Sequence, residues 1–195
     1  MSEPFVEVVP VDDLRRRVGQ LGTEIAADYA HTVPVVVGVL NGCVPFLADL
    51  VRAMPIDVEV DFLALTRFGT DGRVSVAMDT TVALTGRDVL IVEDIVDTGL
   101  TLTALQRMLE VRAPASLRTV ALLDKAPRRI VRVGLDYRGF EVGDEFLLGY
   151  GLDWEGRYRN LRSLWAVLDM GFLAEDPAAF TAVAHGLPGG AIAGR

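Results

Sequence analysis

Three largely apolar runs stand out in the pattern of hydrophobic and polar positions along this chain. They span residues 33–40, 89–92 and 117–123, and polar or glycine-bearing residues follow each of them. Runs rich in β-branched residues are typical of parallel strands that are buried on both faces. Apolar residues at helical spacing around the runs predict helices within residues 12–30 and 102–109. This alternation indicates an α/β domain with a mostly parallel central sheet flanked by helices.

Weaker patterns predict further elements around these runs. Residues 56–65 and 73–78 predict two strands joined by a hairpin loop that contains glycine and aspartate. Residues 140–151 and 163–169 contain shorter strand-like segments. The chain from Ala174 onward is rich in Ala, Gly and Pro, which is typical of a weakly ordered extension.

Length, charge and residue counts narrow the possible functions. The 195 residues are enough for one well-cored domain, which we expect at residues 1–170, followed by a weakly ordered tail at 171–195. No signal peptide and no membrane-spanning run is recognisable, so we expect a cytoplasmic protein with no membrane contact. A formal net charge of −8 argues against nucleic acid as a partner. One cysteine and two histidines exclude a disulfide framework and a Cys/His zinc site, so any metal must be held by carboxylates.

The densest group of candidate functional residues is the stretch DVLIVEDIVDTGLT at residues 88–101. It passes from an apolar run into two adjacent carboxylates, Glu93 and Asp94, and then into a turn that contains Gly99. A helix start attracts anions through its exposed N–H groups and its dipole, and a glycine lets the backbone approach a phosphate. A phosphate cradle beside two acids suits a phosphorylated sugar, whose hydroxyls the acids bind directly or through Mg²⁺. A plain turn with solvated acids has the same spacing, so the spacing alone leaves both interpretations open.

Polar residues also follow other predicted strands. Asn41-Gly42, Lys125 and the region 150–159 lie at or near such strand ends. Because ligands of open α/β sheets gather outside the carboxyl ends of the strands, we expect these residues at one edge of the sheet. The chain has neither the G-x-x-x-x-G-K-[ST] loop of nucleoside triphosphate enzymes nor the G-x-G-x-x-G turn of dehydrogenases.

The segment EDIVDTGLT, residues 93–101, resembles the phosphoribosyl pyrophosphate signature of type I phosphoribosyltransferases. Three later segments, at 122–129, 136–154 and 158–161, resemble the hypoxanthine-guanine branch of that family in order and spacing. The resemblance implies the type I phosphoribosyltransferase fold with a small hood, made of N-terminal residues and residues 136–165. It implies Mg²⁺-dependent transfer of phosphoribosyl from phosphoribosyl pyrophosphate to a 6-oxopurine, hypoxanthine or guanine, in purine salvage. It also implies a homo-oligomer, either a dimer or a tetramer.

The same resemblance implies a role for individual residues. By its position in the motif, Asp97 would be the catalytic base that takes a proton from the purine beside N7. The oxocarbenium-like transition state requires the purine and the leaving pyrophosphate to be held in line. Lys125 would contact the oxygen at purine C6. The purine-binding residues would be Lys125, Phe146, Leu147 and Asp153, with Phe146 stacking on the base. Mg²⁺ would be held by Asp153, Glu93 and Asp94. The phosphoribosyl pyrophosphate site would comprise Asn41, Gly42, Glu93, Asp94, Asp97, Thr98, Gly99, Leu100, Thr101 and Arg159.

This chain departs from the family pattern at two places. Asn41-Gly42 stands where the family usually has Lys-Gly, a peptide that is often cis in the family. Arg67-Phe68 stands where the mobile catalytic loop usually carries Ser-Tyr, and the loop is shorter. Charge compensation motivates the hypothesis that Arg67 replaces the missing lysine at the pyrophosphate.

Two alternatives to this activity are a relative with altered base specificity and a phosphoribosyl pyrophosphate-sensing regulatory protein. The departures at Asn41 and Arg67-Phe68 motivate the first alternative. The fold has been used in RNA-binding regulators, which motivates the second. The net acidity of the chain and the presence of Asp97 and Lys125 favour catalysis over regulation.

Overall fold

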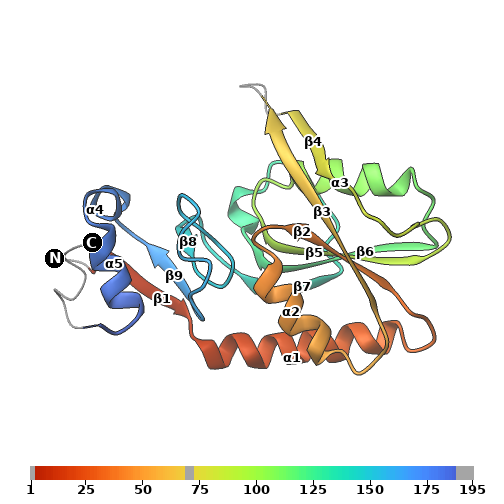
Figure 1. The fold of residues 1–195 in the computed structure, drawn as a ribbon. Helices are drawn as coiled ribbons and strands as arrows, with labels where there is room; N and C mark the ends of the chain where they lie inside the picture. Colours follow the sequence, from red (N-terminus) through yellow and green to blue (C-terminus); the bar gives the residue numbers. More distant parts are fainter. Residues whose placement is uncertain (1–2, 69–72, 188–195) are drawn as a thin grey trace. The chain divides into compact units, whose positions relative to one another are not determined.

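The computed structural model describes residues 3–68 and 73–187 (Figure 1). These residues divide into a larger unit, residues 15–144, and a smaller unit formed by the described parts of 1–14 and 145–195. Each unit has its own sheet. The residues expected to form one domain, 1–170, are therefore shared between two units.

The larger unit is built on a six-stranded sheet with the order β4-β3-β2-β5-β6-β7. All neighbouring strands run parallel except β4, which pairs antiparallel with β3, so the expected mostly parallel sheet is confirmed. Its middle strands are the apolar runs of the sequence, and their valines and isoleucines are buried from both sides. The strands are β2 (Val35–Leu40), β3 (Glu59–Phe68), β4 (Arg73–Met78), β5 (Asp88–Val96), β6 (Ser116–Asp124) and β7 (Tyr137–Glu141).

Helices cover both faces of this sheet. Figure 1 shows α3 (Leu100–Glu110) on one side and α1 (Val11–Asp28) and α2 (Val44–Ala53) on the other. The buried face of α3 packs on the β2, β5 and β6 side chains, and burying each of its leucines contributes roughly 1.5–3 kcal/mol. A short 3₁₀ turn, η1 (Ala126–Arg128), follows β6. No helix among the described residues has both the length and the apolar character that crossing a membrane requires.

Several element boundaries differ from those the sequence predicts. Glu93 and Asp94 lie inside β5 and do not follow it, because β5 continues to Val96 alongside β6. Arg67 and Phe68, expected in the mobile loop, have backbones within β3, where they pair with β4. The glycines expected in that hairpin loop lie outside the described residues.

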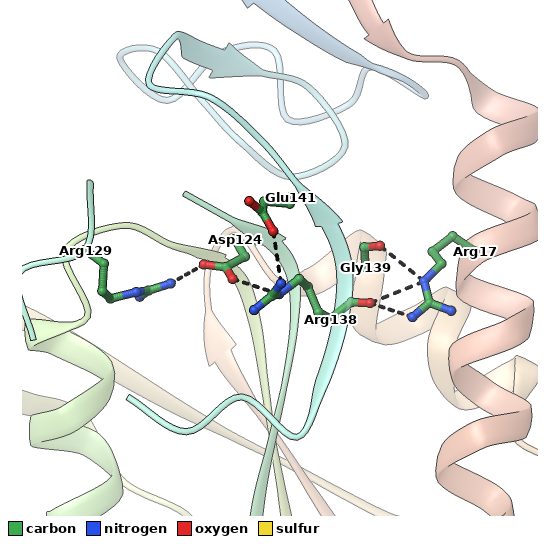
Figure 2. A network of polar contacts seen from close by, with 6 residues as sticks. All are labelled: Arg17, Asp124, Arg129, Arg138, Gly139 and Glu141. Atoms are coloured by element: carbon green, nitrogen blue, oxygen red, sulfur yellow. Dashed lines mark hydrogen bonds and ion pairs between the residues drawn. The ribbon is translucent and has the colours of Figure 1, made fainter. Parts of the chain in front are cut away.

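The edge strand β7 belongs to the larger unit, so residues 137–144 are not part of the smaller unit, in contrast to the expected hood at 136–165. The physical reason is its parallel pairing with β6. Arg17 of α1 strengthens this attachment: its guanidinium donates hydrogen bonds to the carbonyls of Arg138 and Gly139 at 2.6–3.2 Å (Figure 2).

The smaller unit is built on an antiparallel sheet with the order β1-β9-β8. Its strands are β1 (Phe5–Val9), β8 (Phe146–Leu148) and β9 (Leu164–Val167). The strand β1 has no counterpart among the sequence predictions. It pairs with a strand from the far end of the chain, so its partner is not visible in the local pattern.

Residues beyond 170 also differ from the expected weakly ordered tail, as far as Leu187. They form α4 (Met170–Glu175) and α5 (Pro177–Ala184), and Asp169 and Asp176 cap the two helix starts through their carboxylates. The prediction was wrong because Phe180 is fully buried, with its ring 4.8 Å from that of Phe5 and 4.9 Å from that of Tyr158. Residues 188–195 lie outside the described part of the chain.

Candidate active site

A cavity of about 430 Å³ lies at the carboxyl ends of β2 and β5. This is the edge of a parallel sheet where ligands bind in α/β proteins. The cavity brings together most of the residues expected to bind phosphoribosyl pyrophosphate. Its lining residues are Val39, Leu40, Leu65, Glu93, Asp94, Ile95, Val96, Asp97, Thr98, Gly99, Thr101 and Leu102.

The loop between β5 and α3, residues 97–101, turns at Gly99, which has φ +84°. This left-handed conformation favours glycine, and a Cβ there would lie only 2.9 Å from the carbonyl oxygen of Val131. The same segment holds the preceding residue, because the carbonyl of Thr98 accepts hydrogen bonds from the N–H groups of Ile130 and Val131 at 3.0 and 3.2 Å. The loop therefore presents the start of α3, with its anion-attracting N–H groups, to the cavity.

Two adjacent carboxylates line the cavity beside this loop. Glu93 is buried, and its burial and the charge of Asp94 raise its pKa well above the ordinary value. Asp94 is half-buried, and one of its oxygens accepts the N–H of Ile95 at 2.8 Å. Its other oxygen faces Gly42 so closely that any side chain at Gly42 would overlap the carboxylate. The structure thus brings Gly42 to Glu93 and Asp94, as the sequence predicts for one edge of the sheet.

A non-proline cis peptide lies at Leu40–Asn41, one residue before the Asn41-Gly42 peptide at which it was expected. Asn41 itself is exposed. Cys43, the next residue but one, is fully buried, and burial together with the nearby Asp94 and Glu93 charges raises its pKa to about 12. Such a thiol is not a nucleophile at neutral pH.

Asp97, the expected catalytic base, is about half-exposed and forms an ion pair with Arg128. The Arg128 Nε lies 2.7 Å from the Asp97 Oδ1. A carboxylate has two oxygens, so this contact orients the group and leaves the second oxygen as an acceptor. Arg128 was not among the sequence-predicted site residues, although it lies three positions after Lys125 in a segment that carries the resemblance.

Lys125 is buried at the end of β6, next to the end of β5. Its backbone N–H donates to the carbonyl of Val96 at 2.9 Å, and its Nζ lies 3.5 Å from the carbonyl oxygen of Asp144. The hydrogen bond to Val96 places Lys125 one strand away from the loop of residues 97–101, within the same unit.

The other expected site residues belong to the smaller unit. Phe146 is exposed and Leu147 is buried in β8. Asp153 and Arg159 contact each other, with the Arg159 Nη2 at 2.7 Å from the Asp153 Oδ1. The other Asp153 oxygen accepts the N–H of Gly156 at 2.7 Å. Both Asp153 oxygens are therefore engaged by groups of the chain itself.

Comparison with known proteins decides the family. The sequence pattern of the phosphoribosyl transferase domain matches residues 10–155 of this chain. The chain belongs to the phosphoribosyltransferase family. The hypoxanthine-guanine phosphoribosyltransferase of Bacillus subtilis is 39% identical over 158 residues, which cover 79% of this chain and 88% of the relative. That of Aquifex aeolicus is 42% identical over 163 residues, covering 81% of this chain and 92% of the relative.

Solved structures of phosphoribosyltransferases have the same fold. A crystal structure of a hypoxanthine-guanine phosphoribosyltransferase from Bacillus anthracis superposes with a TM-score of 0.80 at 37% identity, covering 83% of this chain and 98% of the other. A hypoxanthine phosphoribosyltransferase from Trypanosoma cruzi, solved as a ternary substrates complex, also has a TM-score of 0.80 at 37% identity. It covers 84% of this chain and 95% of the other. The α/β fold expected from the sequence is therefore that of type I phosphoribosyltransferases.

The carboxylates of this phosphoribosyltransferase can supply only part of the ligand set of a Mg²⁺ ion. Among the described residues, no group of three or more His, Cys, Asp or Glu side chains is arranged to hold a metal by itself. Mg²⁺ is commonly held by one or two carboxylates together with substrate phosphates. Glu93 and Asp94 supply two such hard oxygen groups at the cavity. The site therefore fits a cation that binds together with a polyphosphate substrate.

Proposed function

We propose that this chain is a hypoxanthine phosphoribosyltransferase-like enzyme of purine salvage. It transfers phosphoribosyl from phosphoribosyl pyrophosphate to hypoxanthine or guanine, and the products are the nucleoside 5′-monophosphate and pyrophosphate. The observation that carries the proposal is the cavity at the end of β5, where a glycine turn at a helix start meets Glu93, Asp94 and Asp97 in a member of this family.

The loop of residues 97–101, from here on the phosphate loop, is assigned to the 5′-phosphate. The left-handed Gly99 turns the backbone into the start of α3 at the cavity, and the Thr98 and Thr101 hydroxyls are further donors. Glu93 and Asp94, beside the loop, are placed to accept hydrogen bonds from the ribose hydroxyls. Together with Asp153, they are also the residues that would hold Mg²⁺, which would neutralise charge on the pyrophosphate when bound.

Asp97 is assigned as the general base that accepts the purine N7 proton as the bond to the ribose forms. Its ion pair with Arg128 fixes one carboxylate oxygen, so the other is available for the proton. Lys125 is assigned to the C6 oxygen of the purine, because an ammonium group donates up to three hydrogen bonds and accepts none. An oxygen at C6 is therefore favoured over an amino group.

Phe146, Leu147, Asp153 and Arg159 keep the roles that the family resemblance implies. Phe146 is exposed, and an aromatic ring that is accessible to a ligand can stack on a purine. Arg159 is assigned to the pyrophosphate by charge-assisted hydrogen bonds, and its contact with Asp153 orients the guanidinium. Hypothesised roles for Asn41 and Arg67 at the pyrophosphate stay predictions.

The test is an assay of pyrophosphate release from phosphoribosyl pyrophosphate with hypoxanthine, guanine, xanthine and adenine in turn. We expect turnover with hypoxanthine or guanine, no turnover with adenine, and loss of turnover when Mg²⁺ is chelated. Turnover with another base alone would indicate altered specificity. Absence of turnover with every base, together with RNA binding in a gel shift, would instead support a regulatory protein.

The expected assembly and location need separate measurements. We propose a homo-oligomer in the cytoplasm, on the basis of the family resemblance. Light scattering of the purified protein measures the mass, and a mass equal to that of one chain would contradict the proposal. Cell fractionation tests the location.

A further inference from the structure

Arg129 lies directly behind the phosphate loop, although it has no role in the function proposed above. Its guanidinium forms an ion pair with Asp124, the last residue of β6 (Figure 2). Asp124 is 2% exposed and Arg129 is 18% exposed, so the pair is largely shielded from water. Asp124 immediately precedes Lys125. The pair therefore anchors Arg129 to the strand end that carries the proposed purine-binding lysine.

The opposite side of the Arg129 side chain packs on Gly99. A Cβ built on Gly99 would lie 3.1 Å from the Arg129 Cδ and 3.3 Å from its Nη1, closer than ordinary van der Waals contact. This Nη1 is buried and has no hydrogen-bond partner among the described residues. A buried donor normally finds a hydrogen-bond partner, and this one has none there. This edge of the guanidinium is therefore held by its packing against the loop and by the anchor on Asp124.

The residues that follow Arg129 hold the same loop. The N–H groups of Ile130 and Val131 both donate to the carbonyl of Thr98. The Val131 carbonyl oxygen is the atom closest to the position of a Gly99 Cβ. Residues 129–131 thus contact two consecutive residues of the phosphate loop, and the side chain of Arg129 fixes where this segment begins.

Asp124 has a second cationic partner, which separates two possible roles for Arg129. The Arg138 Nε lies 2.7 Å from the Asp124 Oδ2, and Arg138 also pairs with Glu141 at 3.1 Å (Figure 2). Removing either arginine leaves the buried carboxylate with one cation. Arg138 lies in β7, on the side of Asp124 away from Arg129. If neutralising Asp124 is all that matters, loss of Arg138 and loss of Arg129 have the same consequence.

We propose that Arg129 is a positioning residue for the phosphate loop, holding Thr98 and Gly99 in the conformation that binds the 5′-phosphate of phosphoribosyl pyrophosphate. The proposal rests on the function proposed above. It assigns Arg129 no contact with substrate. Its effect passes through the backbone of the loop, so it concerns affinity for phosphoribosyl pyrophosphate more than affinity for the purine.

The test compares R129Q, R129K and the matched control R138Q with wild type in steady-state kinetics. We expect R129Q to raise the KM for phosphoribosyl pyrophosphate about tenfold, while kcat and the KM for hypoxanthine change by less than about threefold. R138Q should leave all three constants within about twofold of wild type. R129K keeps a cation on Asp124 but cannot fill the planar space behind Gly99, so its KM should lie between those of wild type and R129Q.

Melting temperatures of the same variants complete the test. A purely structural role would lower the melting temperature of R129Q without changing its KM, and that result would overturn the proposal. Equal KM changes in R129Q and R138Q would overturn it as well. If R129Q does not fold, R129K must raise the KM for phosphoribosyl pyrophosphate more than R138Q does. Absence of turnover in wild type would instead refute the proposed function, and calorimetric titration of phosphoribosyl pyrophosphate into wild type and R129K would still test the loop.

Discussion

The helix α5 closes the core of the smaller unit through Phe180, and the variant F180A measures how much that closure contributes. Phe180 is fully buried, and its ring contacts those of Phe5, Tyr158 and Trp165 at centroid distances of 4.8–6.0 Å. Replacing a buried Phe by Ala removes the transfer free energy of the ring and leaves a cavity, at a cost of about 3–5 kcal/mol. We therefore expect F180A to lower the free energy of unfolding by about 4 kcal/mol.

The same helix provides a matched control. Val183 is 50% exposed, so V183A removes two methyl groups that are only partly buried and should cost less than about 1 kcal/mol. Each kcal/mol shifts the melting temperature by about 2–4 °C for a protein of this size, so F180A should melt about 8–16 °C below wild type. Differential scanning calorimetry and urea unfolding of both variants measure the difference.

The consequence of F180A extends to the proposed site, because the same core holds Leu148, Tyr158 and Leu161. These residues flank Phe146, Asp153 and Arg159 in the sequence. We therefore expect F180A to lose activity at temperatures at which V183A keeps it. Equal stabilities of F180A and V183A would refute the argument that α5 is part of the core.

Three further predictions concern single side chains. The Asp61 carboxylate accepts hydrogen bonds from the backbone N–H groups of Phe62, Thr81 and Val82 at 2.7–2.9 Å. Burial raises the pKa of Asp61, but these hydrogen bonds outweigh burial, so the pKa lies below its ordinary value. Its contribution is present above the unfolded pKa near 3.9 and is lost as pH falls through the lower folded value, so D61N should cost about 2 kcal/mol at pH 7 and less in acid. A constant cost in pH-dependent urea unfolding would contradict this. The contribution of Glu93 to stability depends on pH in the opposite direction. Because its pKa is raised, this contribution is full below the unfolded pKa near 4.3 and is lost as pH rises through the folded value. The free energy of unfolding of E93Q should therefore rise relative to that of wild type by up to about 1.4 kcal/mol per pH unit across that window. If the two free energies of unfolding changed with pH in parallel, the prediction would be wrong. Arg128 and Asp97 are both about half-exposed, so R128Q should change the free energy of unfolding by less than about 1 kcal/mol. It should lower kcat about tenfold, because Asp97 loses the group that orients it. An unchanged kcat would show that the ion pair does not orient the catalytic base.

The sequence by itself determined the central elements and the phosphate loop. The strands β2, β5 and β6 are buried on both faces, so they appear as apolar runs in the sequence without reference to any partner. The turn at Gly99 is also local, because a glycine before a helical pattern predicts a tight turn and a helix start. The resemblance of residues 93–101 to a known signature then indicated the family, which the comparisons confirm.

Only the tertiary structure decided the contacts that organise the site. Arg128 and Arg129 contact Asp97, Asp124 and Gly99 because the segment after β6 returns to the end of β5. In the sequence, two adjacent arginines in a charged segment are typical of a solvated surface, and nothing local shows which carboxylates they meet.

The same reason explains the errors at the two ends of the chain. The strand β1 is stabilised by β9, and the helix α5 by the burial of Phe180 against Phe5. Both elements owe their order to partners at the opposite terminus, and neither has a strong pattern of its own. Local periodicity determines an element when its burial pattern is regular along the chain, whereas marginal segments become ordered by the long-range contacts that the fold supplies.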